Sequence, residues 1–115
     1  MSQAAIVLVS CPAELAEPIA EKVVAERLAA CVNILPSATS VYLWQDKLCR
    51  ESESILLIKI QQSGYADLEK RIKELHTYDV PEIIMVSIAA GYFPYLNWIA
   101  ESVGTKTERP ERMEN

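Results

Sequence analysis

Hydrophobic positions alternate along the chain between short continuous runs and sets at helical spacing. Residues 5–10 form an apolar, largely β-branched run, which predicts a strand buried on both faces. From about residue 13 to residue 30, larger aliphatic residues such as Ile19 recur every three to five positions and predict an amphipathic helix. Pro18 must lie in the first turn of this helix or bend it, because proline removes a helical hydrogen bond.

Strand character returns after this helix but is interrupted. Residues 31–35 are apolar, Pro36 breaks the run, and residues 40–44 resume it. A proline in a long strand indicates a bulge or an edge strand, because it donates no hydrogen bond to the ladder. Residues 45–47 predict a hairpin turn, and after a polar stretch a third strand is predicted at residues 55–60.

The second half of the chain predicts a helix, a strand and a short helix. Ser63 is the expected N-cap of a helix that ends near His76, because apolar residues after it follow helical spacing. A fourth strand is expected at residues 82–89 and an aromatic-rich helix at residues 92–103. Residues 104–115 are polar and charged, which predicts a disordered tail.

The predicted order is βαββαβ followed by a terminal helix, within a single domain at residues 1–103. The economical architecture for this order is an α+β, ferredoxin-like fold with a four-stranded antiparallel sheet and helices on one face. The other face of the sheet would be bare, although the third and fourth strands are apolar on both sides. Subunit association is the natural way to cover it.

Composition and charge exclude several classes of protein. The chain has 115 residues, half of them hydrophobic, and 16 acidic residues against 11 basic ones give a net charge of -5. This balance argues against a nucleic-acid partner, which requires a basic surface. The sequence predicts no signal peptide and no membrane span, and its three cysteines form no disulfide or zinc pattern. We therefore expect a cytoplasmic protein with reduced thiols and no membrane partner.

The candidate chemistry is sparse. His76 could bind a metal or transfer a proton, or it could simply cap a helix end. Cys31 could be a soft metal ligand or an inert buried residue, and Glu82 could share a cleft with His76. No glycine-rich phosphate loop or nucleophile motif is present, so we predict no enzyme. Trp44 at a hairpin tip is well placed to anchor in a neighbouring subunit.

Three stretches together, in order, resemble the CutA divalent-cation tolerance family. They read Leu-Ala-Ala-Cys-Val-Asn-Ile at residues 28–34, Ser-Val-Tyr-Leu-Trp at 40–44 with a lysine at 47, and Glu-Leu-His-Thr-Tyr-Asp-Val-Pro-Glu-Ile-Ile at 74–84. The closing Tyr-Leu-Asn-Trp-Ile at residues 95–99 fits as well. The resemblance runs from about residue 6 to residue 103.

This resemblance implies a PII-like homotrimer in which long hairpins from the second and third strands embrace the neighbouring subunits. It also implies a cytoplasmic role in tolerance of divalent metals, copper especially. The chain departs from the commoner family pattern at Ser37 and Asp46, where glycine often stands. Residue by residue, the resemblance gives Cys31, His76 and Glu82 as metal candidates, Lys59 and Tyr78 as ligand-cleft residues, and Tyr42, Trp44 and Trp98 as trimer-interface residues.

Two functions follow as hypotheses. The first is a trimer that binds copper(II) or another divalent cation weakly, because one thiol and one imidazole make a poor closed site. The second is a small-molecule sensor, or a small enzyme in the intersubunit cleft, with His76 or Glu82 as acid or base. A purely structural trimer is a third possibility.

Overall fold

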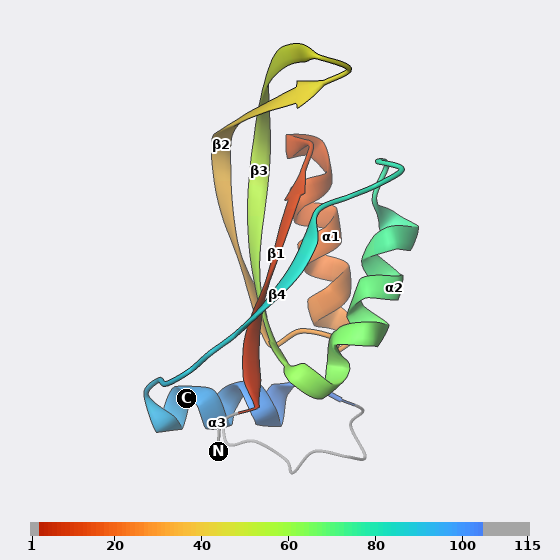
Figure 1. Cartoon of the computed structure of the whole chain (residues 1–115). Coiled ribbons are helices and arrows are strands. Elements are labelled where there is room, and N and C mark those ends of the chain that lie inside the picture. The colour runs from red at the N-terminus through yellow and green to blue at the C-terminus, as the bar shows by residue number, and fades with distance from the viewer. Residues whose placement is uncertain (1–2, 105–115) are drawn as a thin grey trace.

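The protein is described by a computed structural model that covers residues 3–104 (Figure 1). Its elements follow one another as β1 (Ala4–Cys11), α1 (Ala13–Ala25), β2 (Cys31–Trp44), β3 (Lys47–Gln61), a 3₁₀ turn (Gln62–Gly64), α2 (Tyr65–Leu75), β4 (Ile83–Ser87) and α3 (Phe93–Ser102). The four strands form one antiparallel sheet in the order β2-β3-β1-β4. The predicted ferredoxin-like α+β fold is therefore confirmed.

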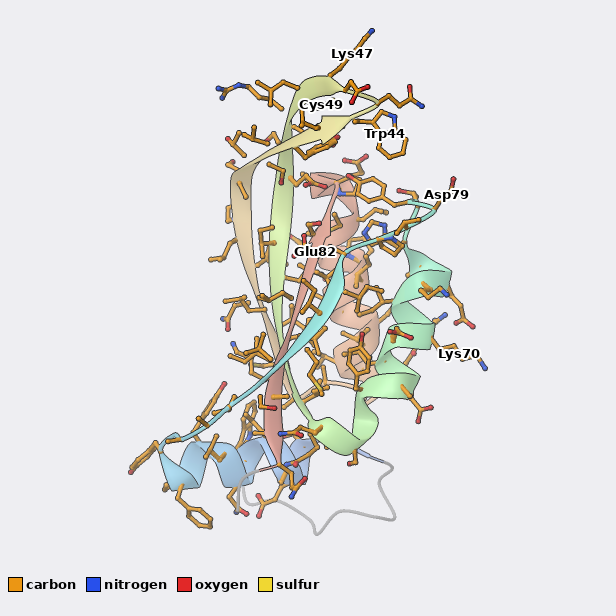
Figure 2. All side chains as sticks on the ribbon, viewed as in Figure 1. Trp44, Lys47, Cys49, Lys70, Asp79 and Glu82 are labelled. Carbon is orange, nitrogen blue, oxygen red and sulfur yellow. The ribbon has the colours of Figure 1, made fainter. Side chains whose placement is uncertain are left out.

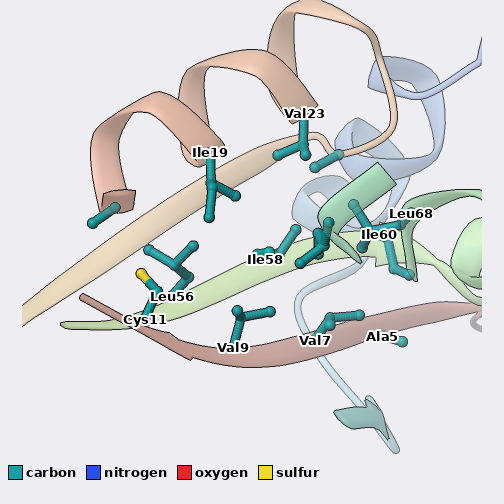
Figure 3. Packing of buried hydrophobic residues seen from close by; sticks show 13 residues of the cluster. Ala5, Val7, Val9, Cys11, Ile19, Val23, Leu56, Ile58, Ile60 and Leu68 are labelled. Atoms are coloured by element: carbon teal, nitrogen blue, oxygen red, sulfur yellow. The ribbon is translucent and has the colours of Figure 1, made fainter. Parts of the chain in front are cut away.

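Helices α1 and α2 lie side by side on one face of the sheet, and the core lies beneath them (Figures 1 and 3). Alternate residues of the two central strands point into it, including Val7 and Val9 of β1 and Leu56 and Ile58 of β3, all fully buried. Burying each such side chain contributes about 1.5–3 kcal/mol. The register pairs Val7 with Ile58 and Val9 with Leu56, so these contacts fix the alignment of the sheet.

The opposite face of the sheet is apolar and largely uncovered among residues 3–104. The side chains that alternate with the core residues lie there, among them Ile6, Leu8, Leu57, Ile84 and Val86. Ile84 and Val86 on β4 are 49% and 50% exposed. Only α3 lies near this part of the fold, across one end of the sheet (Figure 1). The bare face expected from the sequence is present.

The β2–β3 hairpin is much longer than the hydrophobic pattern indicates, and extends beyond the end of β1 (Figure 1). The prediction that the third strand begins at residue 55 is wrong, because β3 begins at Lys47. Its polar half pairs with β2 from Trp44 opposite Lys47 to Ala38 opposite Glu53, so β2 supplies the backbone hydrogen bonds on that side of the strand. The polar residues of this stretch therefore belong to a largely exposed strand and not to a loop.

The interruption at Pro36 is a β-bulge in an edge strand, as predicted. The register shifts between Leu35 and Ala38, and β2 lies at the edge of the sheet. Ser37 within the bulge has a φ of 61°, and the hairpin turn places Gln45 and Asp46 at φ values of 53° and 65°. Two left-handed residues in a two-residue turn are the arrangement that matches the twist of a hairpin.

Helix ends differ from the predictions in two places. The first helix ends at Ala25 and not near residue 30, because Arg27 takes a left-handed φ of 65° and the Leu28 N–H donates to the Val23 carbonyl. Ser63 is not an N-cap, since it lies inside the 3₁₀ turn that leads into α2. Pro18 lies inside α1. The tail predicted at residues 104–115 lies almost entirely outside the described residues.

Candidate functional site

A groove of about 960 Å³ opens between the outer half of the β2–β3 hairpin, residues 38–53, and the segment that links α2 to β4. This linking segment, residues 76–82, is called the crossing segment. Figure 2 shows Trp44 and Cys49 on the hairpin, and Asp79 and Glu82 on the crossing segment. The groove exists because the hairpin outruns β1 and the crossing segment passes over the end that β1 leaves free. Its lining residues are Ser10, Ser40, Val41, Tyr42, Trp44, Cys49, Glu51, Glu53, Tyr78, Asp79, Val80 and Glu82.

Glu53 is a buried carboxylate in the wall of the groove, with 6% of its surface exposed. Each of its oxygens accepts one hydrogen bond, from Ser40 Oγ at 2.6 Å and from Tyr78 Oη at 2.7 Å. Burying a carboxylate is costly unless donors replace water, and these hydroxyls do so. Burial, and then the bond to Glu53, raise the pKa of the Tyr78 hydroxyl well above its usual value, which keeps it protonated and donating.

His76 pins the crossing segment to the sheet. Its Nδ1 accepts a hydrogen bond from the Tyr78 backbone N–H at 3.2 Å, so the ring proton lies on Nε2, which donates to the Ser10 carbonyl at 2.8 Å. The imidazole is buried and its ring lies 4.6 Å from that of Tyr78. Both ring nitrogens are therefore engaged in holding Tyr78 where it can reach Glu53.

Ser10 connects His76 to Glu82. Its carbonyl accepts from the imidazole, and its Oγ donates to Glu82 Oε1 at 3.3 Å. The structure thus brings together three of the residues singled out from the sequence, His76, Tyr78 and Glu82, at the end of β1. This corner of the groove is lined by two carboxylates, Glu53 and Glu82, and the buried imidazole contacts it through Ser10 and Tyr78.

Cys11 lies beneath this corner and is fully buried in the core. Burial raises the pKa of its thiol to about 11, with the nearby charges of Glu53 and Glu14 adding to the effect. A protonated thiol is a poor nucleophile and a poor metal ligand, so Cys11 behaves at neutral pH as a small hydrophobic residue.

The outer hairpin carries the predicted interface residues Tyr42 and Trp44. The Tyr42 hydroxyl donates to Glu51 at 2.7 Å, and this bond is the main cause that raises the pKa of Tyr42 to about 12. Trp44 at the tip is 64% exposed. Trp98 lies elsewhere, half-buried on α3 and stacked on Tyr95 with ring centroids 5.7 Å apart. The three residues thus belong to two separate surfaces of the chain.

Cys31 and Lys59 lie opposite each other on β2 and β3, near the other end of the sheet. The Cys31 thiol contacts Tyr95 Oη at 3.6 Å, and Lys59 donates to the Asn33 side chain. Burial and this contact with Cys31 raise the pKa of Tyr95 to about 12. On β1, Ile6 pairs with Lys59, whereas Ser10 lies four residues further along. Cys31 and the His76 corner are therefore about 13 Å apart along the strands.

Within the part of the chain that the structure describes, no group of three or more histidine, cysteine, aspartate or glutamate side chains is arranged to hold a metal ion. The predicted metal candidates are split, with Cys31 at one end of the sheet and His76 and Glu82 at the other. The described residues of one chain thus do not form a closed metal site. No helix among the described residues is long and apolar enough to cross a membrane.

Sequence reasoning missed Glu53, Ser10, Ser40 and Glu51. Glu51 and Glu53 fall in the polar stretch before the predicted third strand, two residues apart, as side chains on one face of a strand are. That spacing was a usable signal for an extended hairpin. Ser10 offered none, because its role depends on where the crossing segment meets the end of β1.

Comparison with known proteins places the chain among proteins of one family. Residues 5–102 match the family described as CutA1 divalent ion tolerance protein. The divalent-cation tolerance protein CutA of Thermus thermophilus is 45% identical over 100 residues, which cover 86% of this chain and 97% of that one. Human protein CutA is 43% identical over 94 residues, and the match spans only 52% of its length.

Solved structures give the same result. A divalent cation tolerance protein from Thermus thermophilus superposes with a TM-score of 0.85 at 44% identity, covering 88% of this chain and 99% of that chain. A protein from Nostoc described as PII-like CutA, in its apo form, superposes with a TM-score of 0.78 at 35% identity, covering 83% and 92%.

Proposed function

Because the chain belongs to the CutA1 divalent ion tolerance family, we propose that it serves in the response to divalent cations, copper(II) foremost, as a cytoplasmic homotrimer without catalytic activity. The family relationship gives the divalent-cation role. The trimer, the preference for copper and the location are the finer parts of the proposal, and each has its own support and test.

The uncovered sheet face is the observation that carries the proposal of a trimer. Ile84 and Val86 leave about half of their surface exposed, next to the apolar Ile6, Leu8 and Leu57 on the same face. A contiguous apolar face on a small chain is typical of a protein interface. Packing that face against other copies, with the long hairpins reaching around them, would remove it from water.

Copper(II) binding is proposed to be weak and shared between subunits. Imidazole and thiolate suit copper, but His76 and Cys31 lie at opposite ends of one sheet. A cation on His76 Nδ1 would also displace the Tyr78 N–H that now donates there. Binding must therefore offset a lost hydrogen bond, and Glu82, which contacts the same Ser10 as His76, would be a further ligand from the same chain.

Native mass spectrometry of the metal-stripped protein, titrated with copper(II), tests both parts. We expect trimers that take up copper in defined steps, with a step lost in Cys31→Ala or His76→Gln. Cys49→Ala, which removes a half-buried thiol on the hairpin, is the matched control and should keep all steps. Monomers would refute the assembly, and diffuse uptake that is equal in all variants would refute the metal site.

Cell fractionation tests the location. Expression at native levels, followed by separation of cytoplasmic from envelope fractions, should place the protein with the cytoplasmic markers. Recovery with the envelope or an extracytoplasmic fraction would contradict this part of the proposal and leave the others standing.

A second candidate function, a small-molecule sensor or a cleft enzyme that uses His76 or Glu82 as acid or base, is favoured by the groove itself. Its volume of about 960 Å³ is ample for an organic ligand. A thermal-shift screen of nucleotides, small acids and amines tests it, since a ligand at a hundred times its Kd adds about 2.7 kcal/mol of stability. An unchanged melting temperature with every compound would contradict it.

A further inference from the structure

The groove is negatively charged and lined with aromatic side chains. Its four acidic residues and three aromatic residues come from both walls, and no lysine or arginine is among the lining residues. These seven residues are Glu51, Glu53, Asp79, Glu82, Tyr42, Trp44 and Tyr78. A cavity of one charge sign focuses the field and concentrates ligands of the opposite sign.

No basic side chain of the described residues neutralises this charge. Within residues 3–104 the ion pairs are those of Arg71 with Glu26 and Glu74, on the helices and away from the groove. Three of the four groove carboxylates accept hydrogen bonds from neutral hydroxyls instead: Glu51 from Tyr42, Glu53 from Ser40 and Tyr78, and Glu82 from Ser10. Neutral donors position a carboxylate but leave its negative charge in place.

The same hydrogen bonds decide which ligands the groove rejects. The hydroxyl protons of its serines and tyrosines are all donated to carboxylates: Ser10 to Glu82, Tyr42 to Glu51, and Ser40 and Tyr78 to Glu53. An anion, or a neutral ligand that needs donors, would find few protons left in these side chains and four carboxylates opposing it. A ligand that brings its own donors and a positive charge fits this set.

The aromatic residues favour an organic cation over a bare metal ion. In the single chain Trp44 is 64% exposed, and Tyr42 and Tyr78 are 38% and 37% exposed, so their rings are accessible there beside the carboxylates. Aromatic faces attract ammonium groups, and they also pack against an apolar body. A small metal ion uses neither property and needs a closed set of ligands, which the described residues do not form.

We propose that the groove binds a small organic cation, an alkyl or aryl amine, with its ammonium group between the carboxylates of the two walls and its apolar body against Trp44. The proposal rests on the second candidate function, in which the groove holds a small molecule, and names the chemistry of that ligand. It gives the long hairpin a role besides assembly, because the hairpin supplies one wall of the site.

Isothermal titration calorimetry of the full chain with three matched probes tests the proposal. Phenethylamine is the cation, 2-phenylethanol the neutral counterpart and 3-phenylpropionate the anion, all titrated at physiological ionic strength. Phenethylamine should bind at least about tenfold more tightly than either counterpart, as expected for a partly desolvated ammonium between carboxylates. Equal binding of the three probes, or no binding of the amine, would overturn the proposal.

Charge-neutralising variants locate the binding. Glu51→Gln and Glu82→Gln should each weaken phenethylamine binding about threefold to tenfold, because each removes one nearby charge. Glu17→Gln makes the same change on the exposed surface of α1 and should leave the affinity unaltered. Equal losses in all three variants would mean general attraction to an acidic protein and would overturn the proposal.

The competing occupant is a basic side chain from a second copy of the chain. Lys47→Gln and Arg50→Gln remove the basic residues of the hairpin tip. If the amine binds only when these residues are removed, the groove belongs to the subunit interface and the proposal is wrong. Oligomeric state and copper uptake, measured on the same samples, separate this failure from failure of the metal-response function, because neither depends on the amine.

Discussion

The carboxylate of Glu53 organises the hydrogen bonds in one wall of the groove. Its carboxylate is buried and attracts two hydroxyls, one from β2 and one from the crossing segment. Those hydroxyls then draw Ser40 and Tyr78 toward each other across the end of the sheet. The carboxylate therefore acts as a structural tie as well as a charge.

Tyr78→Phe should lower the free energy of unfolding by about 1–2 kcal/mol, because the substitution leaves one oxygen of a buried carboxylate without its donor. Urea denaturation followed by circular dichroism measures this. Tyr92→Phe, at a site that is 76% exposed, is the control and should change stability little. Equal effects of both substitutions would show that the Tyr78 bond to Glu53 contributes nothing.

The buried thiol of Cys11 predicts a loss of stability at alkaline pH. Its pKa rises from an ordinary value of 9.0 to about 11 in the fold, chiefly through burial. The folded state therefore holds the proton more tightly, and the stability from this difference is fully present below pH 9 and lost as the pH rises to about 11. Denaturation midpoints of the wild type should fall across this window, and those of Cys11→Ala should fall less steeply. Parallel curves would contradict the prediction.

At the scale of elements, the hairpin turn is strained by its residue types. Gln45 and Asp46 both take left-handed φ values, a region that suits glycine and costs other residues about 1 kcal/mol or more. The long ladder of β2 and β3 beneath the turn holds it in place. The unfavourable turn is therefore tolerated, because the ladder between β2 and β3 determines the register of the hairpin and the turn does not.

Asp46→Gly should raise the free energy of unfolding by about 0.5–1 kcal/mol, because glycine relieves the left-handed strain at φ 65°. Thermal and urea unfolding at matched protein concentration measure the change. Ser52→Gly, in the middle of β3, is the matched control and should be destabilising, since glycine weakens a strand interior. A loss of stability in both variants would show that the turn is not strained.

Elements whose side chains show a clear hydrophobic pattern were predictable from the sequence. The central strand β1 and the helix α2 are examples, because burial alone sets their spacing. The polar half of β3 was not, because it is stabilised by pairing with β2 across the hairpin and buries little of its own surface. The N-cap prediction at Ser63 failed for a local reason, since a 3₁₀ turn precedes α2.

The site was predictable only in part. His76 and Glu82 stood out by residue type, and the structure brings both to Ser10. The pairing of Glu53 with Tyr78 depends on two long-range facts, the register of the hairpin and the path of the crossing segment. Neither fact can be predicted from the local sequence, so the sequence alone does not identify Glu53 as a site residue.

At the scale of the whole molecule, the fold is elongated, with principal extents of 51 × 27 × 25 Å. Both long helices lie on one side of the sheet, and the hairpin projects beyond them (Figure 1). A chain of this shape leaves one sheet face and one long arm available to neighbours. Those two surfaces are where assembly is expected and where substitutions should act on it.

Ile84→Lys should dissociate the proposed trimer, because it places a charge on a half-exposed residue of the apolar sheet face, on the edge strand β4. Size-exclusion chromatography with light scattering measures the mass. Val24→Lys introduces the same charge on α1, at a side chain that is 38% exposed, and should leave the mass unchanged. An intact trimer in the Ile84 variant would show that β4 lies outside the interface.

Trp44→Ala tests the other surface. If the hairpin tip anchors in a neighbouring subunit, the substitution should weaken association by about 2 kcal/mol, the effect of removing an aromatic hot spot. Dilution series by analytical ultracentrifugation give the association constant. An unaltered constant would mean that the tip lies free in solution.

The bulge beside Pro36 changes which side chains of β2 lie on each face of the hairpin. From Cys31 to Leu35, the odd-numbered residues of β2 lie on the same sheet face as Lys59 and Ile55. The extra residue at the bulge reverses this alternation, so the even-numbered residues lie on that face from Ala38 to Trp44. Ser40, Tyr42 and Trp44 thereby face the groove beside Glu51 and Glu53. Had β2 instead paired residue by residue with β3 through this point, without a bulge, Thr39, Val41 and Leu43 would face the groove. The bulge thus decides whether the side of the hairpin that faces the groove is polar and aromatic or aliphatic.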